Sequence, residues 1–206
     1  MGLFNIKSSE EKKMEKELKI KNFLNEVSLP GLNENNFEYY IVIDFKRRRE
    51  TIFELKSLLM QDEKIEYMTS SSIKFGDKLS AGVLACTNKR VLFSGKIVAQ
   101  IFKTFINHQI PIEKINSIST AKGFNGGINI SDESNSYCFS TSNNAVPFLN
   151  AVNNVSTNLK EENLNVENNT DDIIIMKLER LAVLKEKGIL SDNEFEIQKK
   201  RILEIL

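Results

Sequence analysis

The sequence predicts an α+β protein: a seven-stranded antiparallel sandwich or barrel capped by a helix, with N-terminal helices and a C-terminal αα-hairpin. Three observations lead to this fold class. Short runs rich in β-branched and aromatic residues recur between residues 65 and 140, as in antiparallel sheets. The segments on both sides repeat apolar residues at spacings of three and four, which indicates helices. The 206 residues, 41% of them hydrophobic, suffice for one core domain with appendages.

The N-terminal extension, residues 1–60, is predicted to be helical. Its first helix covers residues 10–27, where Glu15 precedes Lys19 by four residues in the order that supports a helix. Residues 37–60 leave two interpretations open. We favour one long helix ending at Met60, and a strand at residues 39–43, which are aromatic and β-branched, is the alternative.

Residues 61–155 are predicted to form the β domain. Asn88 and Lys89 suit a two-residue hairpin turn, and Asp132–Asn135 suits another turn. Asn144 can cap a closing amphipathic helix, whose apolar side must cover a sheet. The seven predicted strands are residues 65–69, 81–87, 90–94, 98–106, 115–120, 127–131 and 136–140.

Residues 156–170 and 171–206 complete the predicted organisation. The first segment is rich in Asn and Glu and is expected to be a flexible linker. The second is a helical hairpin, in which Gly188 is placed to end the first helix and Ser191 with Glu194 forms a capping box for the next. Because so short a hairpin cannot bury both apolar faces alone, we expect an apolar stripe on it to form an oligomer or partner interface. That stripe consists of Ile174, Leu178, Leu181, Leu184, Phe195, Ile202 and Leu206.

Charge, cysteine spacing and apolar runs argue against a nucleic-acid-binding, metal-binding or membrane-spanning protein. The net charge is zero and no segment is basic enough to favour nucleic acid as a partner. Cys86 and Cys138 lack metal-site spacing, and we expect both to be buried small side chains. No apolar run is long enough to span a bilayer and no signal peptide precedes the domain, so we expect a cytoplasmic protein.

The sequence offers no set of nucleophile, base and orienting group, and we expect a non-enzymatic protein without a cofactor or metal. His108 is expected to be an ordinary surface or turn histidine. One run of basic residues, and two lysines that flank a later loop, are candidates for contact with an anionic ligand. A solvated helix face is the preferred interpretation of the run. These candidates are Lys46, Arg47, Arg48, Arg49, Lys74 and Lys78.

Two resemblances to known families sharpen these expectations. Residues 174–203, with Gly188-Ile189-Leu190-Ser191 followed by Glu194-Phe195, resemble the SHOCT family, the short C-terminal domain of bacterial proteins. Ser191 stands where that family has threonine and Ile202 where it has leucine. The resemblance implies self-association or docking onto another protein.

The middle domain resembles bacterial pleckstrin-homology (PH) domains, in particular the YokE-like group. The resemblance rests on Asp62–Ile65, on Thr87–Phe93, on Ile110-Pro111 and on the closing helix. It implies a PH-like sandwich plugged by a C-terminal helix, with a structural role for the turn at Thr87–Arg90. We therefore expect a PH-like module for protein or peptide binding. The alternative is a peripheral module that senses, or is recruited by, the anionic lipid of a membrane surface.

Replacing Gly188 by valine is expected to unfold the hairpin while leaving the β domain intact. A β-branched residue in a left-handed conformation costs about 1–2 kcal/mol, a large share of the stability of so small a unit. Circular dichroism should show less helix with an unchanged melting transition of the β domain. Full helicity in the variant would mean that Gly188 does not end a helix.

Overall fold

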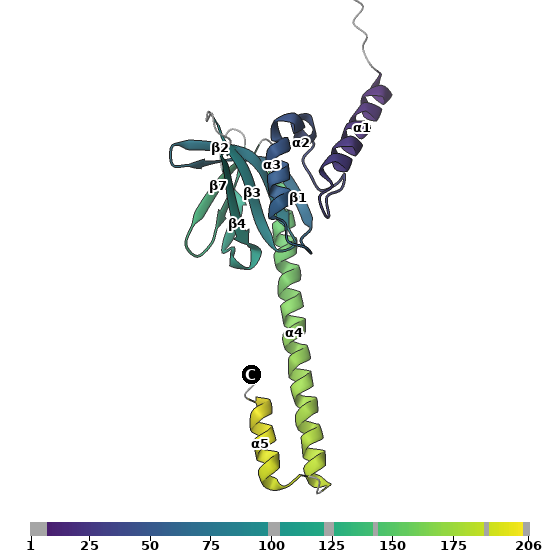
Figure 1. Ribbon diagram of the computed structural model, residues 1–206, viewed down its shortest axis with the longest axis vertical. Helices are drawn as coiled ribbons and strands as arrows, with labels where there is room; N and C mark the ends of the chain where they lie inside the picture. The colour runs from purple at the N-terminus through teal and green to yellow at the C-terminus, as the bar shows by residue number, and fades with distance from the viewer. Residues whose placement is uncertain (1–7, 99–103, 122–125, 142–143, 188–189, 204–206) are drawn as a thin grey trace, which may run out of the picture. The chain divides into compact units, whose positions relative to one another are not determined.

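The computed structural model describes residues 8–98, 104–121, 126–141, 144–187 and 190–203. The chain divides into two compact units, Met1–Ser156 and Thr157–Leu206. Figure 1 labels the elements along the chain. They are α1 (Ser9–Val27), α2 (Tyr40–Ile43), α3 (Phe45–Leu58), β1 (Ile65–Phe75), β2 (Lys78–Thr87), β3 (Arg90–Ile97), β4 (Phe105–Pro111), a 3₁₀ turn (Ile112–Lys114), β5 (Ser117–Thr120), β6 (Gly127–Ser131), β7 (Ser136–Thr141), α4 (Val146–Glu186) and α5 (Asp192–Leu203).

The seven strands form one antiparallel sheet in the order β4-β3-β2-β1-β7-β6-β5, so the predicted α+β fold class is confirmed. Successive strands pair as hairpins within β1–β4 and within β5–β7. The two halves join where β1 pairs with β7, with Ser72 opposite Ser140. The strands at the two ends of this order, β4 and β5, are therefore the edges of the sheet.

The fourth strand lies further along the chain than predicted. The prediction placed it at 98–106, but β4 spans Phe105–Pro111 and pairs so that Leu92 faces Gln109. The apolar residues that follow Val98 led the prediction to start this strand too early in the chain. Residues 99–103 lie outside the described part of the chain. His108 is consequently a half-buried residue within β4, not a surface or turn residue.

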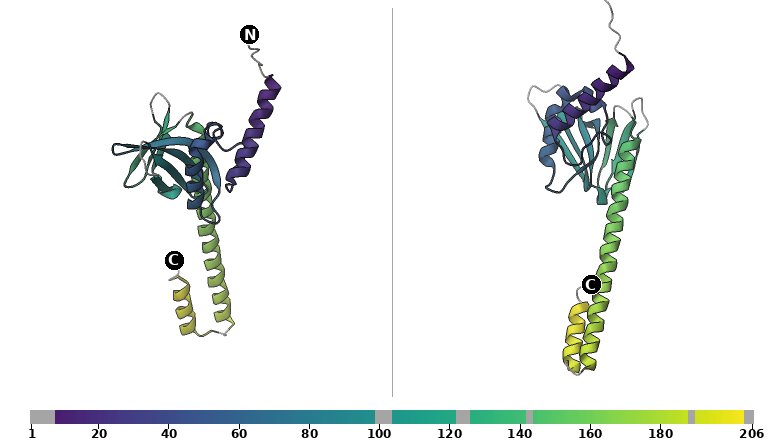
Figure 2. Two further views of the ribbon diagram at one scale, coloured as in Figure 1. Left: turned by 45° about the horizontal axis from the view of Figure 1, so that its top comes forward. Right: turned by 90° about the vertical axis from the view of Figure 1, so that its right-hand side faces the viewer.

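The N-terminal helices belong to the same compact unit as the sheet. The predicted long helix over 37–60 is two helices, with Asp44 between them, and the alternative strand at 39–43 is absent. Ile41, Ile52 and Leu55 are fully buried in one apolar cluster with residues of β1, β2 and β3. The views in Figures 1 and 2 show α3 lying across this half of the sheet. Residues 40–58 thus form a layer that covers this half of the sheet.

This covering layer explains the burial of β2 and β3. From Gly82 to Thr87 every side chain or glycine of β2 is buried, and so is every residue from Arg90 to Gly95. A strand with one solvent-exposed face alternates between buried and exposed residues, as β7 does. A continuous run of buried residues means that both faces of the strand are covered. The runs Ala81–Cys86 and Val91–Phe93 carried this signal in the sequence.

The closing helix does not stop where the sequence predicted. Asn144 caps it as expected, because its Oδ1 accepts the backbone N–H of Val146 at 3.0 Å. The helix then continues to Glu186, so the backbone over residues 156–170 is helical where an irregular linker was expected. Neither Gly nor Pro, the residues that interrupt helices, occurs between residues 148 and 187. Because extending an existing helix is easier than starting a new one, the helix continues through this segment.

Ile52→Ala is expected to lower the free energy of unfolding by about 2–4 kcal/mol, because Ile52 is fully buried between α3 and the sheet. Ile43→Ala, at a position that is 65% exposed, is the matched control and should change it by less than about 0.5 kcal/mol. Urea denaturation of the full chain measures both. Equal small effects would mean that the N-terminal helices do not contribute to the folded domain.

Candidate functional site

A buried ion pair stands at the centre of the most polar part of the core. Glu63 is 0% exposed and the side chain of Arg90 is 9% exposed. The guanidinium of Arg90 donates from Nε to Glu63 Oε1 at 2.9 Å and from Nη2 to Oε2 at 2.7 Å. Arg90 also donates to the carbonyl of Leu58 at 2.7 Å and to the side-chain oxygen of Gln109. The ion pair thus joins the end of α3 to β3 and β4.

The carboxylate of Glu63 is satisfied by more than Arg90. It accepts the hydroxyl of Thr87 at 2.7 Å and the backbone N–H of Met60 at 3.0 Å. Burial on its own would raise the pKa of Glu63. The hydrogen bonds from Arg90, Met60 and Thr87, with the positive charge of Arg90, outweigh burial and hold this pKa below its ordinary value. Glu63 therefore stays ionised in the folded protein.

The turn Thr87–Arg90 has the structural role that was predicted for it. Asn88 exchanges two hydrogen bonds with the backbone of Lys64, at 3.0 Å and 2.9 Å, and Lys89 forms an exposed ion pair with Asp62 at 2.8 Å. Each of the four side chains of the turn thus bonds to Asp62 or Glu63 of the same chain. This cluster is closed by internal partners and presents no reactive group to a substrate.

A second buried carboxylate is also fully engaged. Glu38 accepts the hydroxyl of Thr69 at 2.7 Å and the backbone N–H of Ser70 at 3.0 Å. These bonds attach the segment before α2 to β1, beside the parallel bridge between Phe37 and Met68. Both buried carboxylates therefore fasten the N-terminal layer to the sheet.

The candidate anionic-contact residues do not gather into one surface. The side chain of Arg48 is 15% exposed, pairs with Asp44 at 3.2 Å and donates to the carbonyl of Gly82. Arg49 pairs with Glu26 at 2.8 Å and lies over the ring of Phe53. Arg48 is therefore held against the sheet, whereas Arg49 forms an exposed ion pair with α1. The sequence could not distinguish these arrangements from solvated cations.

The remaining four candidates face different places. Lys46 lines a groove of about 340 Å³ between α1 and the α2–α3 pair, together with Phe23 and Ile43. Arg47 lines a groove of about 320 Å³ between α3 and strands β2 and β3. Lys74 and Lys78 are exposed near the β1–β2 turn and line neither groove.

Most of the predicted apolar stripe of the hairpin is half-buried. Five of its residues are half-buried, namely Leu178, Leu181, Leu184, Phe195 and Ile202. Ile174 and Leu206 lie outside the side chains that the structure describes, as does Gly188. The capping box is present, with Ser191 N–H donating to Glu194 at 2.9 Å and Glu194 N–H to Ser191 at 3.4 Å.

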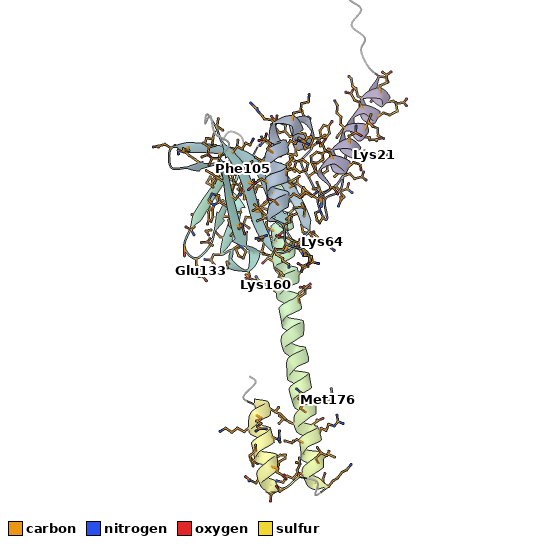
Figure 3. All side chains as sticks on the ribbon, viewed as in Figure 1. Lys21, Lys64, Phe105, Glu133, Lys160 and Met176 are labelled. Atoms are coloured by element: carbon orange, nitrogen blue, oxygen red, sulfur yellow. The ribbon has the colours of Figure 1, made fainter. Side chains whose placement is uncertain are left out.

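Four other apolar residues of the hairpin are exposed, and the sequence analysis did not select them. They are Ile175 (53%), Met176 (65%), Val183 (44%) and Ile197 (46%). Figure 3 labels Met176 on α4, above the turn that leads to α5. The seven-residue spacing of Met176 and Val183, which places both on one side of a helix, was the signal that could have revealed this face.

The other candidate groups give no catalytic arrangement. Cys86 is buried, and burial raises the pKa of its thiol far above the ordinary range, while Cys138 is exposed, which corrects the prediction that both are buried. Burial lowers the pKa of His108, whose ring packs beside those of Phe93 and Tyr137.

Among the described residues, no three His, Cys, Asp or Glu side chains are placed to hold a metal ion. In the same described part, no helix is long and apolar enough to cross a membrane.

Comparisons with known proteins place this geometry in a family. The family model "Bacterial PH domain" matches residues 59–175, more than half of the chain. No curated protein matches the sequence. A crystal structure of the C-terminal domain of an unknown protein from Leishmania infantum is 17% identical and covers 47% of this chain and 82% of its own, with a TM-score of 0.32. The hSac2 domain of the human phosphoinositide phosphatase Sac2 is 11% identical over 50% of this chain and 68% of its own, with a TM-score of 0.29.

Arg90→Met is expected to lower the free energy of unfolding by about 3–5 kcal/mol, because it leaves the carboxylate of Glu63 buried without its partner. Lys89→Met, the same substitution one residue away in an exposed pair, is the control and should leave the melting temperature nearly unchanged.

The same ion pair also sets a pH dependence. Because the folded-state pKa of Glu63 is lowered, its contribution to stability is complete above the pKa of an unfolded glutamate, about 4.3, and is lost as the pH falls through the folded value. Urea midpoints between pH 7 and pH 3 should fall more steeply in the wild type than in the double variant Glu63→Leu, Arg90→Met. Parallel slopes would contradict this assignment.

Proposed function

This chain belongs to the bacterial PH domain family, and from this premise we propose that it is a non-enzymatic scaffold whose PH-like domain binds a protein or peptide and whose C-terminal hairpin pairs with a second copy. A binding role, for a protein or a lipid, is the function that membership of this family supports. Self-association and the choice of partner are our proposals.

One observation carries the proposal: the hairpin has no core of its own. None of its described side chains is fully buried. The predicted apolar stripe, including Leu181 and Phe195, is half-buried. The four exposed residues defined above then remain for another surface, Ile175, Met176 and Val183 on α4 and Ile197 on α5. Two short helices with both faces this poorly covered gain stability when a second hairpin covers the outer face.

The charges of the hairpin support a second copy as the occupant. The described part of the hairpin mixes basic and acidic residues on both helices, so two copies have no large like-charge surfaces to oppose. Acidic residues, Asp192 and Glu194, begin α5, and basic residues, Lys200 and Arg201, end it, as the helix dipole favours. The resemblance to SHOCT hairpins agrees with this role.

The sheet offers a place for a peptide partner at its edges. The edge strand β5 is short and largely exposed, and an extended peptide could add to its free backbone groups as a further strand. On the other edge strand, β4, the half-buried ring of His108 packs against the ring of Tyr137, which comes from β7. Specificity would come from the side chains that alternate along the added strand.

The alternative function, recruitment to anionic membranes, is supported by one feature of the sheet. Leu79 and Val98 are 48% and 52% exposed and adjoin each other, because Val98 N–H donates to the carbonyl of Leu79 at 2.8 Å. Lys74 is paired with Leu79 in the β1–β2 register. An exposed apolar pair beside a lysine combines the two features by which a peripheral protein contacts an anionic lipid surface.

Met176→Glu combined with Val183→Glu is expected to convert a self-associated protein to monomers, because it places two charges on the outer face of the hairpin. Gln198→Glu, at an exposed polar position of α5, adds the same kind of charge as a control and should leave assembly unchanged. Light scattering on the full chain at micromolar concentration measures the mass. A monomeric wild-type protein would rule out the proposed self-association.

A further inference from the structure

The groove between α3 and strands β2 and β3 is lined by cations and by no carboxylate. Its volume is about 320 Å³, and three of its seven lining residues are basic. These residues are Arg47, Arg48, Thr51, Ala81, Lys96, Ile97 and Val98. Because α3 precedes the residues matched by the family model, one wall of this groove comes from outside the matched region.

Arg48 is a fixed donor at the base of the groove. Its Nε faces Asp44 at 3.2 Å, and its Nη1 donates to the carbonyl of Gly82. These two contacts hold the planar guanidinium against the sheet. The second terminal nitrogen, Nη2, has no bonding partner in the part of the chain that the structure describes, and it is available to an anion.

Lys96 is held at the opposite wall. It forms an ion pair with Glu50 of α3, and its Nζ lies 5.5 Å from the centre of the Phe105 ring. Its side chain is 26% exposed, so the ammonium is partly shielded from water. Charges shielded in this way act on a ligand more strongly than freely solvated ones.

Arg47 supplies the unbalanced charge. Asp44 and Glu50 together offset two of the three cations around the groove, namely Arg48 and Lys96. The exposed guanidinium of Arg47 forms no ion pair with any residue that the structure describes. The groove therefore carries one net positive charge and two guanidinium groups with donors to spare.

We propose that this groove binds a phosphate group through Arg47, Arg48 and Lys96. Guanidinium groups match the paired oxygens of phosphate, and a preoriented arginine loses little freedom on binding. The groove is at the small end of ligand pockets, which suits a phosphate-bearing small molecule or a single lipid head group. The site lies within the first unit, and its test does not depend on self-association through the hairpin.

Titration of the full chain with inorganic phosphate, at constant ionic strength, tests the site by calorimetry. Arg47→Gln should weaken phosphate binding by about tenfold, as expected for loss of one charge-assisted donor pair. Lys46→Gln removes the same charge from the neighbouring position, which lines the other groove, and should leave the affinity unchanged. Circular dichroism melts should show that both variants fold like the wild type.

Vesicles of phosphatidylcholine with and without phosphatidic acid identify the source of the phosphate. Phosphate binding that depends on Arg47, without vesicle binding, assigns the groove to a soluble phosphorylated molecule. Vesicle binding that requires phosphatidic acid and is lost in Arg47→Gln but kept in Lys46→Gln assigns it to a lipid head group. Equal losses in both variants, or no binding of either probe by the wild type, would overturn the proposal.

Discussion

The ion pair between Glu63 and Arg90 is the interaction on which the arrangement of this domain depends. It is buried and bidentate, and its members also reach Leu58, Met60, Thr87 and Gln109, so it fixes the end of α3, the β2–β3 turn and β4 in one step. A buried pair adds little net stability compared with apolar residues of the same size. We infer that it specifies the register of the turn, because in this placement both charges are hydrogen-bonded.

Once that junction is set, the N-terminal layer follows. The carbonyl of Leu58 is bound by Arg90, so α3 must end beside the sheet, and its buried face, with Ile52 and Leu55, then covers the outer face of β2 and β3. Glu38 fastens the preceding segment to β1 in the same manner. The groove lined by Arg47 and Lys96 exists because α3 is held there, which links the proposed phosphate site to the integrity of the fold.

In our proposal the first unit of the chain is the folded binding domain, and the second unit, the hairpin, mediates assembly. The first has a core of fully buried side chains, whereas none of the described side chains of the hairpin is fully buried. A unit without a core can form a stable surface only with a partner. The interface in the hairpin stays a prediction. In our proposal it lies on the side that carries Met176 and Val183, because these residues are exposed while Leu178, Leu181 and Leu184 are half-buried.

Local patterns determined the α+β class, six of the seven strand positions, the cap at Asn144 and the capping box at Ser191, because turn chemistry and apolar period act between near neighbours. Tertiary structure alone decided that α3 covers the sheet, that Arg48 and Arg49 are bound internally while Arg47 is not, and that His108 lies within a strand. Arg48 meets Gly82 across a separation of 34 residues and Arg49 meets Glu26 across 23. Charge or propensity at one position carries no information about which distant group it will meet.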